Sequence, residues 1–224
     1  MKVTLTRYTT EPHEAIESAA SNCYDSIPNG KILAACYKSG HHSVLEFAQF
    51  HFHIEGVSRA LTHQLVRHRT GSFAQRSQRY VSSDNFDYVT PPALLENNDH
   101  TKAARDLYED TIKRINECYE VMQSLGIKNE DARFILPNAC CTTIDVSFDF
   151  RNLIHFMNER LCSKAQWEIR ELAQKMRKCV LEVFPEAESM LVPKCERFEV
   201  PFCTESKSCG RHVKLKDVVD KNER

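Results

Sequence analysis

The chain of 224 residues lacks long hydrophobic runs, an excess of charge of either sign and a secretory start. No apolar stretch reaches the roughly 18 residues that a membrane-spanning helix needs, so we expect no membrane protein. Residues 1–7 contain neither an apolar signal core nor a cleavage site, which favours a cytoplasmic protein. The formal net charge is −1, so the chain is not the overall polycation that would indicate nucleic-acid binding. Any basic function must therefore be local.

Cysteine, in contrast, is plentiful, with ten residues. Disulfide frameworks are typical of short secreted chains, so we expect reduced thiols here. Four residues near the C-terminus are a possible zinc set: Cys195, Cys203, Cys209 and His212. Their spacing is not the paired Cys-x-x-Cys arrangement of common zinc sites. We therefore expect no bound metal, and reduced surface cysteines on a C-terminal extension, with zinc as the alternative.

Hydrophobic periodicity predicts a mixture of strands and helices, and hence an α/β (α+β) fold. Strands are expected at residues 2–8, 50–55 and 142–148. Helices are expected at residues 12–24, 31–39, 57–69, 108–122, 129–131, 150–159 and 163–184. Residues 82–101 are polar and contain two adjacent prolines, which predicts a loop. We expect one domain over residues 1–190 and an irregular extension, with cysteines and prolines, over residues 191–224.

Residues 56–83 contain no aspartate, glutamate or lysine. They contain five arginines: Arg59, Arg67, Arg69, Arg76 and Arg79. A guanidinium binds phosphate through two parallel hydrogen bonds, and it also stacks on flat rings. Gly71 would let the backbone approach a ligand closely. The segment therefore favours nucleotide binding. A subunit interface with acidic partners is the first alternative, and polynucleotide binding is disfavoured because the rest of the chain has no basic stripe.

The order of the motifs adds a resemblance to a known family. One motif consists of Arg67-His68-Arg69, seven further residues and then Ser77. It is similar to the signature of the flavin-dependent thymidylate synthases. Further blocks resemble the same family and follow in its order: Gly40-His41-His42-Ser43, Arg133-Phe134-Ile135-Leu136-Pro137, Arg151-Asn152-Leu153-Ile154-His155-Phe156, and Arg160 with Lys164-Ala165-Gln166-Trp167-Glu168-Ile169-Arg170. A lone Arg-His-Arg motif would be weak evidence for the resemblance. Five blocks in the family's order over residues 40–170 are strong evidence for it.

The resemblance implies a single domain with a central mixed or antiparallel sheet and long flanking helices. It also implies the reductive methylation of deoxyuridylate (dUMP) to thymidylate (dTMP), and thus a flavoprotein methyltransferase of nucleotide biosynthesis. The one-carbon donor would be 5,10-methylenetetrahydrofolate, and NADPH would supply reducing equivalents through FAD. The implied assembly is a homotetramer whose active sites are shared between subunits, with neither nucleic acid nor membrane as a partner.

Site residues follow from the resemblance position by position. The implied dUMP contacts are Gln64, Leu65, Val66, Arg67, Gln75, Arg76, Ser77, Gln78, Arg79, Arg133 and Arg160. The implied FAD contacts are Ser43, Arg67, His68, Arg69, Gln75, Asp149, Arg151 and His155. At Asp149 the family often has asparagine, and a carboxylate cannot donate hydrogen bonds as an amide does.

Arg160 is the implied catalytic residue. The chain has no cysteine in the Pro-Cys-His context of the classical thymidylate synthases, so we expect no thiolate attack. An arginine that favours the N3 anion of uracil would instead increase electron density at C5. Ser77 is expected to bind rather than attack, because the sequence shows no base beside it. The competing hypotheses are another flavin- or nucleotide-dependent oxidoreductase and a nucleic-acid-binding protein.

Overall fold

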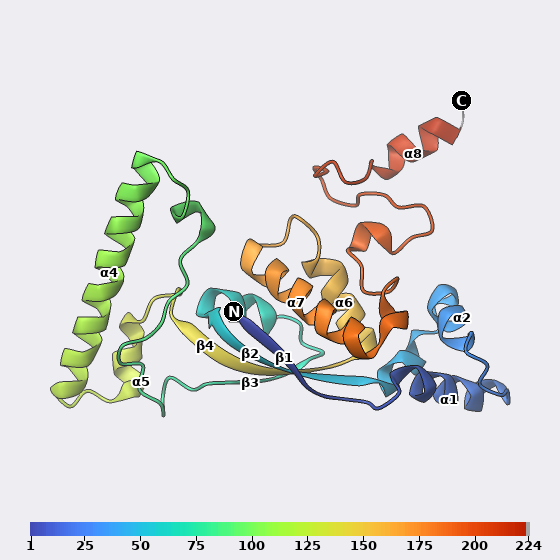
Figure 1. Cartoon of the computed structure of the whole chain (residues 1–224), viewed down its shortest axis with the longest axis horizontal. Helices are drawn as coiled ribbons and strands as arrows, with labels where there is room; N and C mark the ends of the chain where they lie inside the picture. Colours follow the sequence, from blue (N-terminus) through green and yellow to red (C-terminus); the bar gives the residue numbers. More distant parts are fainter. Residues whose placement is uncertain (223–224) are drawn as a thin grey trace. The chain divides into compact units, whose positions relative to one another are not determined.

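The protein is described by a computed structural model that covers residues 1–222 (Figure 1). The chain contains two compact units. Unit 1 consists of residues 1–2, 54–67 and 74–145. Unit 2 consists of residues 3–53, 68–73 and the chain from Val146 onward. None of the described helices is long and apolar enough to cross a membrane.

A four-stranded sheet has the order β1-β2-β4-β3. Its strands are β1 (Lys2–Tyr8), β2 (Gln49–Ser58), β3 (Ser72–Gln75) and β4 (Cys141–Asp149). In unit 2 the amide of Phe150 donates to the carbonyl of Ala48, and in unit 1 the amide of Arg59 donates to that of Cys140. As residue numbers rise along β2 they fall along β4, so the two strands are antiparallel, as the whole sheet is. The expected fold class is confirmed.

The core of unit 2 contains a cluster of aromatic side chains, and helices surround it. Its helices are α1 (Pro12–Tyr24), α2 (Ile32–Ser39), η1 (His42–Phe47), α6 (Phe150–Arg160), α7 (Trp167–Val183), η4 (Pro185–Ala187), η5 (Lys194–Glu196) and α8 (Leu215–Asn222). Helices α6 and α7 lie side by side (Figure 1). The ring of Phe150 lies 6.0 Å from that of Phe50 and 5.0 Å from that of Phe184, and all three are buried. Burial of each such ring contributes on the order of 2 kcal/mol.

Unit 1 contains α3 (Arg59–Leu65), η2 (Pro92–Leu94), α4 (Asp99–Ser124), α5 (Asn129–Ala132) and η3 (Arg133–Ile135). Helix α4 begins with a capping box, in which Asn98 and Thr101 satisfy each other's backbone amides. Tyr119 on α4 is buried, and its hydroxyl accepts a hydrogen bond from the amide of Ser83. Because Gly126 has a φ of 85°, it can end this helical segment without strain.

Several predicted boundaries were wrong. The helix expected over residues 57–69 is only Arg59–Leu65, because Val57 stays in β2 and the Ser58 hydroxyl caps the helix by accepting from the Leu61 amide. Strand β3 was not predicted, since four residues carry too little periodicity. The loop expected to residue 101 ends where α4 begins, at Asp99.

The helix expected over residues 163–184 begins only at Trp167, because the Gln166 side chain caps it by accepting from the amides of Glu168 and Ile169. The extension expected to be irregular contains α8. The division between residues 190 and 191 stays a prediction. All ten cysteines are free in the structure.

Candidate functional site

A hydrogen-bonded pair of a buried histidine and a partly buried arginine lies in unit 2. The side chain of Arg160, at the end of α6, donates through Nε to Nε2 of His68 over 3.0 Å. The His68 ring meets the ring of Phe156 edge-on at 5.0 Å and that of His155 at 5.9 Å. Only 8% of His68 is exposed. The fold thus joins the middle residue of the signature to an arginine that lies 92 residues further along the chain.

The protonation state of His68 follows from its surroundings. Burial, then the charge of Arg160 and the neighbouring His155, lower the pKa of His68 to about 4. His68 is therefore neutral near pH 7. Because a guanidinium only donates, Nε2 must be the accepting nitrogen of this ring. Burial also lowers the pKa of Arg160, while the Glu159 carboxylate raises it. The bond to His68 uses only the Nε–H group, so the donors on the two terminal nitrogens remain for other partners.

Close packing holds the turn after His68 in place. The amide of Gly71 donates to the carbonyl of His68, and a Cβ atom at Gly71 would lie 2.5 Å from Cε1 of Phe148. Phe148 in turn stacks on Phe156, with ring centroids 5.5 Å apart. Gly71 was expected to allow a ligand to approach. The observed close approach is instead to Phe148 and Phe73, so the glycine positions the turn that carries His68.

A cavity of about 780 Å³ also lies in unit 2. It is lined by Tyr37, Lys38, His42, Arg151, Asn152, Ile154, His155, Asn158, Ser189, Arg197, Phe198 and Glu199. The rings of Tyr37 and His42 stack at 5.4 Å, and the guanidinium of Arg197 lies 4.6 Å from the centroid of Phe198. Flat rings and cations together suit an aromatic ligand that carries phosphate.

Two of the predicted FAD residues, Arg151 and His155, line this cavity. Ser43 follows the lining residue His42 in η1 and is exposed. Arg151 currently pairs with the carboxylate of Glu46 at 2.6 Å, and both side chains are about half exposed. A surface ion pair of this kind contributes little, roughly 0 to 1 kcal/mol, so a phosphate could displace Glu46.

Asp149 has a structural task in unit 2. One carboxylate oxygen accepts from the backbone amide of Asn152 over 2.8 Å, and the other accepts from the Asn152 side chain over 2.6 Å. Asp149 is therefore the N-cap of α6. The cap uses one acceptor site on each carboxylate oxygen, so a contact with flavin at Asp149 would have to use the remaining sites, as an acceptor only.

In unit 1, a pocket of about 270 Å³ gathers positive charge. Its lining residues are Arg59, His63, Gln78, Arg133, Phe134, Leu136, Pro137 and Asn138. Burial, opposed by Cys140, lowers the pKa of Arg59, and the like charge of Arg133 lowers it further. A bound anion would relieve this repulsion between the two guanidinium groups. Two predicted dUMP residues, Gln78 and Arg133, are brought together here.

Hydrogen bonds within unit 1 order the loop that follows the signature. Gln75 donates to the Thr62 hydroxyl over 3.0 Å, and Arg76 donates to the Ser82 carbonyl. The Ser77 hydroxyl accepts from the amide of Arg79, which is a local turn that supports a binding role rather than a nucleophilic one. Arg79 itself pairs with Glu130 at 3.1 Å.

The remaining predicted residues differ in accessibility. Arg67 and Arg69 are exposed, and Gln64 is half-buried. Val66 is partly exposed, whereas the side chain of Leu65 is fully buried. Leu65 as a whole is inaccessible to a ligand in the single chain, so its predicted contact with dUMP stays a prediction.

Arg59 and His63 line the pocket of unit 1 but were not among the predicted contact residues. Their place in the segment without acidic residues was the signal that could have marked them. Tyr37 and Arg197 line the cavity of unit 2, and no sequence motif marks them.

Comparison with known proteins identifies the family. The family described as "Thymidylate synthase complementing protein" matches residues 4–186. The flavin-dependent thymidylate synthase of Nitratidesulfovibrio vulgaris is 40% identical over 94% of this chain and 95% of its own. This chain belongs to the flavin-dependent thymidylate synthase family. The synthase of Geobacter sulfurreducens is 38% identical over 96% of this chain and 97% of its own.

The fold of the family is also the fold of this chain. A crystal structure of the flavin-dependent thymidylate synthase from Helicobacter pylori, complexed with FAD and dUMP, superposes with a TM-score of 0.66 at 23% identity. The superposition covers 83% of this chain and 99% of the other. At this level of identity the likeness establishes the fold alone.

Proposed function

We propose that this protein is a flavin-dependent thymidylate synthase that methylates dUMP to dTMP. The observation that carries the proposal is the hydrogen bond between Arg160 and the buried His68. It connects the Arg67-His68-Arg69 signature with the arginine that the family resemblance assigns to catalysis. Membership of the family, over nearly the whole chain, supports the same activity.

Arg160 would act on the uracil ring of dUMP. A guanidinium beside N3 stabilises the anion that forms when the N3 proton leaves, by charge and by hydrogen bonding. The anion would raise electron density at C5, so that C5 could bond to the one-carbon unit as the bond from that unit to tetrahydrofolate breaks and the C5 proton is lost, without a covalent bond to the protein. His68 would contribute by positioning, since its neutral ring accepts the Nε–H of Arg160 and so restricts the rotation of the guanidinium.

The cavity in unit 2 fits the chemistry of FAD. Its stacked rings suit a flat heterocycle, and Arg151 and Arg197 suit the phosphates of a dinucleotide. His155 lines this cavity and also packs against His68. One residue therefore borders both the cavity and the pair of His68 and Arg160. FAD held there, once reduced by NADPH, would supply the hydride that turns the one-carbon unit into a methyl group.

The pocket of unit 1 fits the phosphate of dUMP. Arg59 and Arg133 present two guanidinium groups to one space, and Gln78 adds a neutral amide. A bidentate pair with phosphate would offset the unfavourable contact of the two like charges. Gln75 and Ser77 lie shortly before Gln78 in the chain and are half-buried, which agrees with their assignment to nucleotide binding.

Further partners of the reaction are proposed from the family resemblance. We expect 5,10-methylenetetrahydrofolate as the one-carbon donor and NADPH as the reductant. We also expect a cytoplasmic homotetramer with shared active sites. Sharing would explain why Arg67 and Arg69, which carry the signature, are exposed in the single chain.

The deciding experiment is the release of tritium from dUMP labelled at C5, with FAD, NADPH and methylenetetrahydrofolate present. The purified protein should release tritium and form dTMP only with all three. The Arg160→Ala variant should bind FAD but lose most turnover, at least about a hundredfold, as for loss of one oxyanion donor. The matched control is Arg114→Ala, which removes an exposed arginine on α4.

Three outcomes would contradict the proposal. Undiminished dTMP formation by Arg160→Ala would remove the catalytic role of Arg160. Oxidation of NADPH without dTMP formation would indicate a different flavin-dependent oxidoreductase. Salt-dependent binding to polynucleotides without a yellow cofactor would indicate a nucleic-acid-binding protein.

A further inference from the structure

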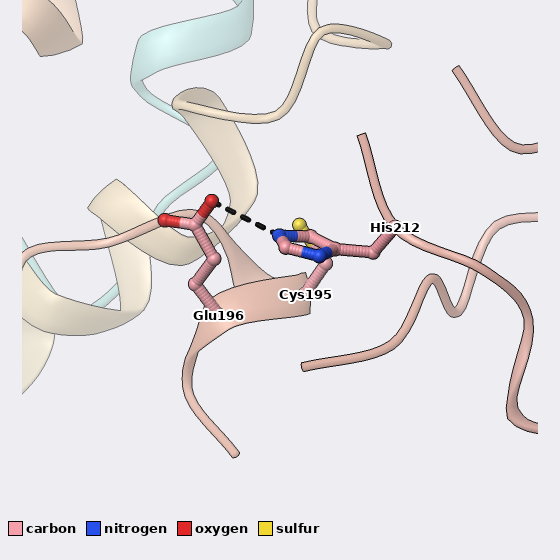
Figure 2. A group of neighbouring side chains, drawn as sticks. All are labelled: Cys195, Glu196 and His212. Carbon is pink, nitrogen blue, oxygen red and sulfur yellow. Dashed lines mark hydrogen bonds and ion pairs between the residues drawn. The ribbon is translucent and has the colours of Figure 1, made fainter. Parts of the chain in front are cut away.

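Three potential metal ligands meet in the C-terminal part of unit 2. Ligand atoms of Cys195, Glu196 and His212 all lie within 4.8 Å of one another. Cys195 and Glu196 belong to η5, whereas His212 returns to them from a later segment (Figure 2). The carboxylate of Glu196 lies 3.2 Å from Nε2 of His212. The three side chains therefore converge although their residues are separated along the chain.

Three more cysteines line a cavity beside this group, and their thiols lie outside the 4.8 Å group itself. A small cavity is lined by Cys162, Cys195, Cys203, Cys209 and His212, together with Ser163, Lys164, Pro193, Lys194, Thr204, Glu205 and Arg211. Four cysteines and one histidine thus line one cavity from four stretches of chain. The set includes the four residues whose spacing in the sequence did not match a standard metal motif, and it adds Cys162.

Apolar burial does not explain why this segment folds back on itself. Among the described residues of 194–218 none is buried as a whole, although the Cys195 ligand group is buried. The backbone is held by few bonds, such as those from the Phe202 amide to the Cys195 carbonyl and from the Cys203 amide to the Val213 carbonyl. Ordering each residue costs roughly 1–2 kcal/mol of backbone entropy. A cross-link at the cavity would offset this cost, as structural metals do in segments without a core.

We infer that the chain binds a structural zinc ion at the cluster of Cys162, Cys195, Cys203, Cys209 and His212. Cys195 and His212 are ligands, and two of the other three thiolates complete a tetrahedral site. Thiolate and imidazole are the ligands that select zinc in structural sites. Glu196 hydrogen-bonds Nε2 of His212, which leaves Nδ1 for the metal and orients the ring.

Charged side chains also surround the cavity. Arg211 and Lys194 both line it. Nε of Arg211 lies 2.5 Å from the Glu196 carboxylate, and Lys194 lies 2.6 Å from that of Glu205. Arg211 and His212 contact the same oxygen of Glu196, so Arg211 helps to fix the carboxylate that orients the His212 ring.

The zinc would attach the extension to the catalytic helix. Cys162 follows two residues after Arg160, and Lys194 lies 3.6 Å from Glu159 on α6. The ion would join this end of α6 to residues 195–212, all within unit 2. The inference concerns stability and metal content and does not depend on the proposed reaction.

The test is the metal content of the full chain, purified without added zinc and without chelators. We expect about one zinc per chain. The Cys195→Ser and His212→Asn variants should each contain at least tenfold less zinc under the same conditions. The matched control is Cys118→Ser, because Cys118 is an exposed cysteine on α4 in unit 1. It should retain the zinc.

A second measurement uses the unmutated protein, in case a variant fails to fold. Titration with a mercurial reagent should release the zinc in step with modification of the cysteines. Cobalt-substituted protein should show thiolate-to-cobalt charge transfer and tetrahedral absorption bands.

Absence of zinc, even after dialysis against buffered free zinc, would overturn the inference. So would a count of two fewer thiols than the ten cysteines, which indicates a disulfide. A brown iron–sulfur spectrum would replace zinc by a cluster and would equally overturn it.

Discussion

Mild acid should destabilise this protein through His68. The pKa of His68 is about 4 in the folded chain, against 6.5 for an ordinary histidine, chiefly because the ring is buried and then because Arg160 is close. The unfolded chain therefore binds the proton more strongly than the folded chain. The stability due to the neutral ring is fully present above pH 6.5 and is lost as the pH falls through about 4.

The size of the effect follows from the two pKa values. The difference between 6.5 and about 4 corresponds to about 3 kcal/mol when the loss is complete. Between pH 7 and pH 5, His68 alone should lower the free energy of unfolding by about 2 kcal/mol. Because His68 is only 8% exposed, solvent screening should reduce this value little. A change of this size is a large part of the stability of a typical domain.

The assay is urea unfolding at pH 7, 6 and 5, at one fixed protein concentration. The variant His68→Gln keeps an acceptor for Arg160 but cannot titrate, so its stability should fall by about 2 kcal/mol less than that of the parent protein. The matched control is His100→Gln, which removes an exposed histidine of α4 and should leave the acid sensitivity unchanged.

Equal loss of stability between pH 7 and pH 5 in the parent protein and in His68→Gln, within about 0.5 kcal/mol, would contradict the prediction. His68 would then not be a buried neutral acceptor. The turnover of His68→Leu adds a second check. That variant removes the acceptor, so its kcat should fall further than that of His68→Gln, because Arg160 would lose its anchor.

Three further predictions concern binding and stability. Arg133→Ala should raise the Kd for dUMP about tenfold or more, which is equivalent to about 1.4 kcal/mol. The control variant Arg114→Ala should leave this Kd unchanged. Calorimetric titration of both variants with dUMP measures the difference. Gly71→Ala should destabilise the fold by about 1–3 kcal/mol, because its Cβ would clash with Phe148, and a Tm unchanged from the parent protein would contradict this packing. Asp149→Ala should cost about 1 kcal/mol in urea unfolding through loss of the cap of α6, and Asp149→Asn should restore most of it, since asparagine caps as well as aspartate.

Much of the fold could be predicted because its signals are local. The alternation of Phe50, Phe52 and Ile54 with polar residues matches β2, where all three are buried. Helix α4 follows from its apolar repeat and from the glycine beyond its end. The failures lie where a local pattern is too short or where a side chain moves a boundary. Ser58 delays the start of α3, and Gln166 delays the start of α7.

The candidate site shows the same limit. Adjacency in the sequence marked Arg67, His68 and Arg69, and the family resemblance supplied Arg160. Composition could also indicate that the arginine-rich segment binds an anion. It could not indicate that Arg59 and Arg133 face one pocket, because the contact joins residues far apart in the chain.

The family, the concentration of arginines and the supply of cysteines can all be read from the order of the amino acids. The burial and neutrality of His68 and its bond to Arg160 become visible only in the folded chain. So does the meeting of Cys195 and His212. Burial and long-range contacts arise from packing. The aromatic cluster of Phe148 and Phe156 excludes water from His68, and no property of the residues beside His68 in the chain contains that information.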